Sequence, residues 1–175
     1  EFTSVNKLYQ EAFKKNWDRP AISNYHGETL HYKDVARRME KLHIMFEECG
    51  LEKGHKVAIC SRNQANWAVT FLAIMTYGAV PVPLLHEFKS ANIHHLVNHS
   101  EAKILFVDDV IWEGLSESEM PDLQAIIQVN TFKILYAVDE KIVEAKNHLN
   151  ELFGRKYPEA FESHMLNYYE DSADE

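Results

Sequence analysis

Residues 56–84 read KVAICSRNQANWAVTFLAIMTYGAVPVPL, and this stretch decides the fold class. Lys56–Cys60 ends in an unbroken apolar run, which is typical of a buried strand. Residues 64–77 are apolar almost all round and predict a helix that is buried on several sides. Gly78 is a good stop for that helix, and residues 79–83 again have the character of a strand.

The flanking sequence continues the alternation of strands and helices. Apolar residues at helical spacing predict a helix from Tyr32 to Cys49, while the opposite face carries Lys33, Arg37, Arg38, Lys41 and Glu48. Other strands are expected at 20–25, 29–32, 103–107 and 125–129, and another helix at 90–99. Strands separated by helices of this length predict an α/β fold with a doubly wound, mainly parallel sheet. Pro81 and Pro83 lack an N–H, which places residues 79–83 at a sheet edge or at a strand end.

Composition excludes several classes of protein. The chain has 27 acidic residues against 18 Lys and Arg, a net charge of −9, so it lacks the basic footprint of a nucleic-acid binder. Residues 63–85 carry no charge, but Gly78, Pro81 and Pro83 would break a membrane helix, so no transmembrane segment is expected. Two cysteines cannot form a disulfide framework, and a cytoplasmic location is expected.

The chain shows no phosphate-binding loop and no nucleophile arrangement. All six glycines are isolated, so neither dinucleotide nor P-loop motifs occur. Cys60 and Ser61 end a strand, but no His and carboxylate spacing singles out a triad. Cys49 lies on the apolar face of its helix and reads as inert core. No catalytic residue can be named from the sequence.

Two groups of titratable residues have plain structural interpretations. His94, His95 and His99 share one predicted helix, and His95 and His99 have the spacing of two zinc ligands. Without a third ligand nearby, they are interpreted as a solvated helix face, and no metal site is predicted. Asp108-Asp109 resembles the acidic pair of a response-regulator receiver, but no later strand ends in Asp at a suitable distance. The pair is therefore interpreted as a strand end followed by a helix start.

Six segments, in order, resemble the start of the adenylate-forming superfamily. SVNKLY…RPAI matches its opening helix and first strand, TLHYKDV its L-T-Y-x-E-L segment, and CGLEKGHKVAI its G-L-x-x-G-D-R-V-A-I segment. NQANWA, LAIMTYGAVPVPL and NHSEAKILF match three further segments. These stretches occupy residues 4–22, 29–35, 49–59, 63–68, 72–84 and 98–106. His31, His55 and Asn66 depart mildly from the pattern. The Trp67 segment and the G-A-V-P-V-P run look most like the long-chain fatty-acid–CoA ligases.

The resemblance implies a domain organisation and a reaction. Residues 1–130 would be the α/β subdomain of an adenylate-forming N-terminal domain, 131–169 a helical insertion or extension, and 170–175 an acidic linker before a phosphate loop that is absent from these residues. The parent enzyme would use ATP, Mg²⁺ and CoA to convert a fatty acid into acyl-CoA, AMP and pyrophosphate through an acyl-adenylate. The catalytic motifs would follow residue 175, so these residues alone are expected to be inactive and to bind none of the cofactors.

Several expectations remain open at this point. In acetyl-CoA synthetase relatives the loop after the G-A-V strand approaches CoA; here it holds Leu85, His86 and Glu87, which makes His86 and Glu87 the candidates for CoA approach. The acidic Glu87 would repel CoA phosphates, which favours a plain surface loop. Alternatives to the fatty-acyl enzyme are a peptide-synthetase or aryl-acid adenylation domain and a non-enzymatic α/β binding module. The expected partner is the remainder of the enzyme's own chain, and a dimer through exposed apolar surface is a further hypothesis.

Overall fold

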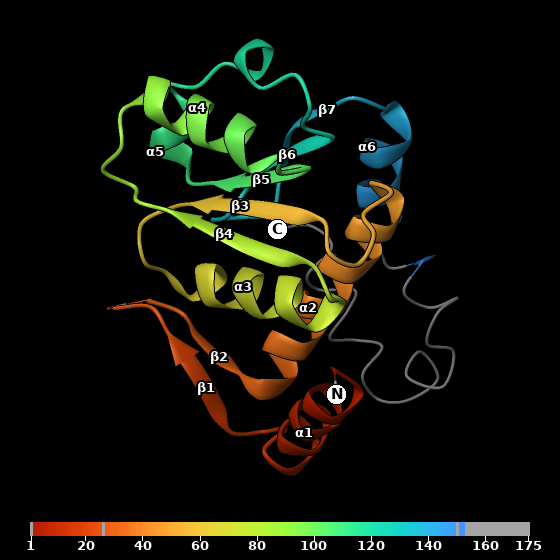
Figure 1. Ribbon diagram of the computed structural model, residues 1–175. Coiled ribbons are helices and arrows are strands. Elements are labelled where there is room, and N and C mark those ends of the chain that lie inside the picture. Colours follow the sequence, from red (N-terminus) through yellow and green to blue (C-terminus); the bar gives the residue numbers. More distant parts are fainter. Residues whose placement is uncertain (1, 26, 150, 153–175) are drawn as a thin grey trace.

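A five-stranded sheet runs through the middle of the chain, with helices on both of its faces (Figure 1). The computed structural model describes residues 2–25, 27–149 and 151–152. The strands are β1 Pro20–Ser23, β2 Thr29–His31, β3 Lys56–Cys60, β4 Val80–Leu84, β5 Ile104–Val107, β6 Ala125–Gln128 and β7 Ile134–Ala137. The helices are α1 Phe2–Lys15, α2 Tyr32–Glu48, α3 Ala65–Tyr77, α4 Ser90–Ser100, α5 Asp109–Trp112 and α6 Glu140–Asn147, with a 3₁₀ turn η1 at Glu117–Glu119.

The predicted mainly parallel, doubly wound sheet is confirmed. Its strand order is β4-β3-β5-β6-β7, in which the first four strands are parallel and β7 runs antiparallel to β6. The chain passes from β3 to β4 on one side and then returns to β5 on the other side of β3. The strands β1 and β2 form a separate antiparallel pair next to α1 (Figure 1).

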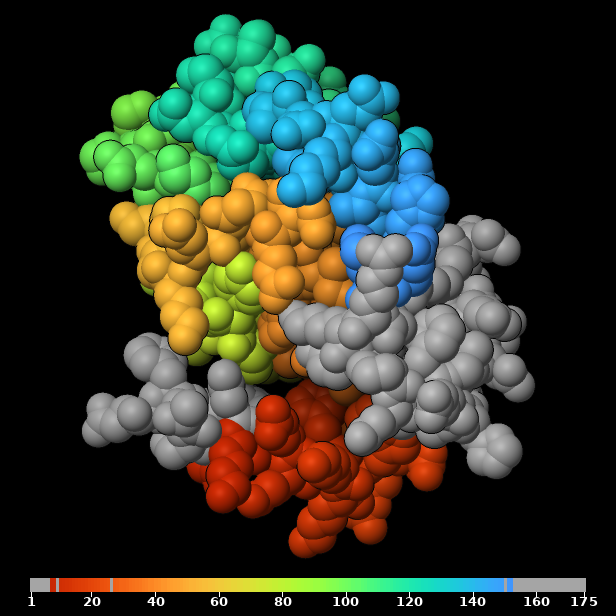
Figure 2. Space-filling view, turned by 90° about the vertical axis from the view of Figure 1, so that its right-hand side faces the viewer, coloured from red at the N-terminus to blue at the C-terminus, as the bar shows by residue number. Residues whose placement is uncertain are grey.

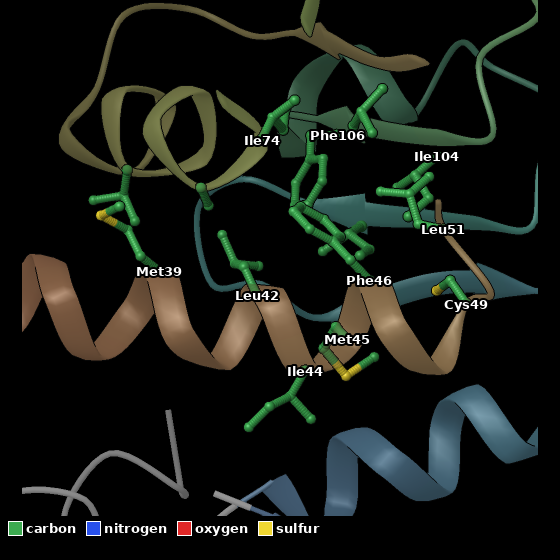
Figure 3. Close-up of a cluster of buried hydrophobic side chains, with 14 of the residues drawn as sticks. Met39, Leu42, Ile44, Met45, Phe46, Cys49, Leu51, Ile74, Ile104 and Phe106 are labelled. Carbon is green, nitrogen blue, oxygen red and sulfur yellow. The ribbon is translucent and has the colours of Figure 1, made fainter. Parts of the chain in front are cut away.

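Alternating side chains divide the core into two layers. Val57 and Ile59 of β3, in register with Ile104 and Phe106 of β5, face the layer of α2, α3 and α6. The intervening residues of the same strands face the layer that contains α4. In Figure 3, Leu42 and Phe46 rise from α2 towards the sheet, and the ring of Phe46 meets Phe106 edge to face at 6.1 Å. The face of α2 that the apolar spacing predicts to be buried therefore packs against the sheet.

The two prolines of β4 protect the edge of the sheet. The N–H of Val80 donates to the carbonyl of His55, so the residues at 80, 82 and 84 point their N–H groups towards β3. Pro81 and Pro83 occupy the alternate, outward positions, where an N–H would otherwise meet solvent. The expected edge position of this strand is confirmed, and a further strand would find no donors at these two positions.

One boundary expected from the sequence is wrong. The helical insertion over 131–169 does not begin at 131, because residues 134–137 pair with β6 as the edge strand β7. The run is only four residues long, too short to reveal a period. Helix α3 begins at Ala65, one residue after the expected start, and the N–H of Ala65 donates to Oδ1 of Asn24 at 2.7 Å. The cap therefore comes from the β1–β2 turn, distant in sequence.

The C-terminal part of the chain is described only as far as residue 152. Helix α6 begins at Glu140 and packs beside α2 on the face shown in Figure 2. The proposed acidic linker at 170–175 lies outside the described residues. Over the described ranges, the helices are all too short or too polar to cross a membrane.

Candidate functional site

The parallel strands place four loops at one end of the sheet. Successive crossovers diverge at β3 and β5, because β4 lies on one side of β3 and β5 on the other. In open α/β sheets, ligands bind outside the carboxyl ends of the strands at such a point, which is called the switch point. The loops that meet there follow β3 at residues 61–64, β5 at 108 and β6 at 129–133, and the loop at 85–89 follows the edge strand β4.

Asp108 is the buried centre of this end of the sheet. Its side chain is 0% exposed, and Oδ2 accepts hydrogen bonds from the backbone N–H of Arg62 at 3.0 Å and from Nε of Arg62 at 3.1 Å. Its other oxygen, Oδ1, caps α5 by accepting from the N–H of Ile111 at 2.9 Å. Burial alone would raise the pKa of Asp108, but these donors and the guanidinium outweigh it and hold the pKa below the usual aspartate value. Asp108 is thus a fixed anion that holds the loop after β3.

Asp109 and Asn130 extend this cluster outwards. The Nη2 of Arg62 donates to Oδ1 of Asp109 at 3.1 Å, and the N–H of Asp109 donates to Oδ1 of Asn130 at 3.1 Å. The carbonyl of Asn130 accepts from Nδ2 of Asn66 at 2.9 Å. Five polar residues, Arg62, Asp108, Asp109, Asn130 and Asn66, are therefore joined across the carboxyl ends of β3, β5 and β6. Sequence reasoning placed Asp108-Asp109 correctly at a strand end and a helix start but missed Arg62 and Asn130.

The arrangement is suited to bracing loops. A general base needs a lone pair that is available to substrate, whereas both oxygens of Asp108 already accept protein N–H donors. Ser61 Oγ donates to the carbonyl of Arg62 and accepts from Gln64. Burial, with a contribution from Asp108, raises the pKa of Cys60 to about 11, so its thiol stays protonated near neutral pH.

His86 and Glu87 lie on the connection between β4 and α4, at the same end of the sheet. Both side chains are exposed, and His86 Nε2 lies 3.9 Å from Glu87 Oε1. The thiol of Cys60 is 3.7 Å from the carbonyl of Leu85 and ties the start of this loop to β3. The loop therefore reaches the edge of the switch-point region, and its approach to CoA stays a prediction.

The three histidines of α4 have structural contacts of their own. His94 Nε2 accepts from the N–H of Ser116 at 3.1 Å, and the rings of His95 and His99 stack with centroids 5.9 Å apart. Within the described ranges, no three His, Cys, Asp or Glu side chains are grouped so that they could hold a metal ion. Cys49 is buried directly after the last residue of α2, and burial with the nearby Glu48 raises its pKa to about 12.

Comparison with known proteins identifies relatives of two kinds. The chain is 26% identical over 131 residues to a long-chain-fatty-acid–CoA ligase of Xenopus laevis, which covers 71% of this chain and 18% of the relative. It is 23% identical over 108 residues to surfactin synthase subunit 2 of Bacillus subtilis, which covers 62% of this chain and 3% of the relative. The chain spans less than a third of the length of such relatives.

A solved structure and a family model extend this result. A long-chain-fatty-acid–CoA ligase from Archaeoglobus fulgidus superposes with a TM-score of 0.62 at 21% identity, over 80% of this chain and 29% of that one. That likeness concerns the fold, and it agrees with the sheet expected from the sequence. The model of the family described as AMP-binding enzyme matches residues 9–166, which is most of the chain. The chain therefore belongs to the AMP-binding enzyme family, as its resemblance to the adenylate-forming superfamily indicates.

Proposed function

We propose that this chain is the front portion of an AMP-forming fatty-acyl-CoA synthetase. The observation that carries the proposal is the family match over residues 9–166, with fatty-acid–CoA ligases of Xenopus laevis and Escherichia coli among the relatives. In the reaction, the fatty-acid carboxylate attacks the α-phosphorus of ATP and pyrophosphate leaves. The CoA thiol then attacks the acyl carbon of the acyl-adenylate, and AMP leaves.

The described residues would brace that reaction and not perform it. They do not fit a Mg²⁺ site, since both oxygens of Asp108 accept N–H donors and Asp109 is bound by Arg62. Stabilising charge on a reacting phosphoryl group requires donors aimed at it. The cluster of Arg62, Asp108, Asp109 and Asn130 instead holds the carboxyl ends of three strands in place. We therefore assign the phosphate-binding and metal-binding steps, with the ATP, Mg²⁺ and CoA they need, to residues outside this chain.

Pyrophosphate exchange into ATP tests the proposal directly. The longest natural protein that contains these residues should catalyse exchange with fatty acids and not with amino acids or benzoate. The 175-residue chain alone should catalyse none. Fatty-acid-dependent exchange by the 175-residue chain would contradict its expected inactivity, and absence of exchange with any carboxylate in the longer protein would favour a binding module.

A second candidate function has specific support. Two surfactin synthase subunits of Bacillus subtilis match over 108 residues, so an adenylation domain for an amino acid or aryl acid is the alternative. The same assay separates the two, because the alternative predicts exchange with amino or aryl acids. The next codons of the source gene offer a further check, since both enzymes require a Ser/Thr/Gly-rich loop that ends in Lys.

We also propose that the protein is cytoplasmic and forms a dimer. Two buried free cysteines are compatible with the reducing cytoplasm. The exposed side chains of Met75 and Val80 supply apolar surface near the edge strand β4, through which two copies would associate. Light scattering that finds only monomers at high concentration would contradict the dimer.

A further inference from the structure

A pocket of about 380 Å³ lies between α2, α6 and the β6–β7 turn. It belongs to the face on which α2 and α6 lie beside each other (Figure 2). Its apolar part is formed by Leu42, Met45, Ile127, Phe132 and Leu149. The volume falls at the lower end of the range for small-molecule sites, so the pocket has room for a small apolar ligand.

The amine of Lys146 borders this apolar part. Lys146 lies on α6, three residues before Leu149, and its side chain is half-buried. It forms no hydrogen bond and no ion pair with the described part of the chain. Burial lowers the pKa of Lys146, because the ammonium form loses hydration more than the neutral amine does. A larger share of this amine is therefore neutral near neutral pH than of an exposed lysine.

The cations around Lys146 act in the same direction. Arg37, Arg38 and Lys41 line the same pocket, and its one lining carboxylate, Glu28, accepts from Nη2 of Arg38 at 2.9 Å. Burial, followed by the charges of Arg37, Lys146 and Arg38, lowers the pKa of Lys41 to about 8. The repulsion between the two lysines acts on both of them. It therefore opposes protonation of Lys146 as well.

The β6–β7 turn gives the pocket a fixed aromatic wall. Phe132 has a φ of +58°, which bulky residues rarely adopt, and its N–H donates to the carbonyl of Gln128 at 2.8 Å. Its ring packs edge to face on Phe106 with centroids 6.4 Å apart. Backbone strain of this kind gathers at ligand sites. The turn thus holds a surface against which an apolar body can pack.

This combination of an amine and an apolar pocket favours one kind of chemistry. A lysine that is desolvated among apolar side chains, or that lies next to another cation, is activated as a nucleophile and forms Schiff bases with carbonyl compounds. Lys146 meets both conditions. The apolar walls select the carbonyl compound by its body, since they offer a charged group no partner of opposite sign other than Glu28.

We propose that Lys146 forms a Schiff base with a small apolar aldehyde held in this pocket. The amine nitrogen attacks the carbonyl carbon, and a proton passes from nitrogen to oxygen to give a carbinolamine. Loss of water then forms the C=N bond, so one amine and one aldehyde yield one imine and one water. The body of the aldehyde would lie against Met45, Phe132 and Leu149. The site is separate from the carboxyl-end cluster and does not depend on the proposed synthetase activity.

Reductive trapping of the 175-residue chain with benzaldehyde and cyanoborohydride tests the proposal. The reductant converts each imine into a stable benzylamine, which peptide mass spectrometry locates. Lys141 is an internal reference on the same helix, because it is 70% exposed and lies 3.7 Å from a carboxylate oxygen of Glu48. Each unit by which a pKa falls raises the neutral fraction about tenfold, and weaker basicity takes back part of that gain, so Lys146 should be labelled at least about threefold faster than Lys141.

Matched variants and a competitor separate the amine from the pocket. K146R keeps the positive charge but removes the primary amine, so the fast label should disappear. K141R should leave the labelling rate at Lys146 unchanged. Benzyl alcohol has the same body without a carbonyl, so it should slow labelling at Lys146 and not at Lys141. Circular dichroism checks that both variants remain folded.

The pH dependence of labelling supplies a second readout. The rate at Lys146 should level off at a lower pH than the rate at Lys141, because the amine of Lys146 loses its proton at a lower pH.

Three outcomes would overturn the proposal. The first is an equal labelling rate at Lys146 and Lys141, which would make Lys146 an ordinary surface amine. The second is fast labelling that benzyl alcohol does not slow, because the pocket would then not hold the body. The third is a fast label on Lys41 in place of Lys146, which would make Lys41 the nucleophile.

Discussion

Replacement of Asp108 by Asn tests whether the switch-point cluster is held by one buried carboxylate. The substitution keeps the shape but leaves a single acceptor oxygen, while three N–H groups point at the native carboxylate. Leaving a buried donor without a partner costs about 1–3 kcal/mol. The side chain of Arg62 is 52% exposed and regains water, so the backbone donors decide the cost. We expect D108N to lower the free energy of unfolding by about 2 kcal/mol.

Asp109 provides a matched control one residue away. Its side chain is 53% exposed, and its ion pair with Arg62 joins two half-exposed groups. Such pairs contribute about 0–1 kcal/mol, so D109N should cost well under 1 kcal/mol. Urea unfolding, followed through the fluorescence of the three tryptophans, measures both variants. Equal losses in D108N and D109N would refute the assignment of a buried, hydrogen-bonded carboxylate.

The pH dependence of D108N supplies an independent check. The folded-state pKa of Asp108 lies below 3.8, the ordinary aspartate value, so its contribution to stability is complete above that value. It is lost as the pH falls through the folded-state pKa. The difference in free energy of unfolding between wild type and D108N should therefore be largest near neutral pH and shrink below pH 3.8. A difference that stays constant on acidification would contradict the charge-based explanation.

Three further substitutions or treatments probe the core. Phe46→Ala empties a fully buried position against two aromatic rings and should cost about 3–5 kcal/mol in urea unfolding, whereas a loss under 1 kcal/mol would mean that the core rearranges. Gly78→Ala forces a side chain at φ +92° against Lys53 and should cost about 1–2 kcal/mol, visible as a lower melting temperature. Cys49 and Cys60, whose pKa values are raised to about 12 and about 11, should react with a thiol reagent at pH 8 far more slowly than in the urea-unfolded chain; equal rates would disprove their burial.

Local patterns predicted the elements, and tertiary contacts decided what the sequence could not reveal. The apolar run at 56–60 and the prolines of β4 are properties of single segments, so strand and edge could both be predicted. The cap of α3 comes from Asn24, 41 positions before Ala65, and no local signal indicates it. The short strand β7 is defined by its pairing with β6 and not by its own period.

The cluster around Asp108 could be predicted only in part, because its members come from distant segments. The strand end at Asp108 could be inferred from the sequence, but its partner Arg62 is 46 residues away. The two meet because parallel register aligns Cys60 with Val107, so the residues after each strand leave the sheet side by side. The sequence predicts that Arg37, Arg38 and Lys41 share one face of α2. Only the packing of α6 beside α2 shows that this face lines a pocket together with Lys146.

One line of hydrogen bonds connects the switch point with Arg38 of α2. It runs from Arg62 through Asp109, Asn130 and Asn66 to Arg38, with each link between 2.6 and 3.1 Å. Asn130 links two helices, since its side chain accepts a hydrogen bond from the first residue of α5 and its carbonyl accepts one from Asn66 of α3. The strands of a sheet can stay in register without such a line of hydrogen bonds. We therefore infer that these ordered polar side chains serve to position the elements that they join. The loops at the strand ends are thereby fixed relative to α2 and α3.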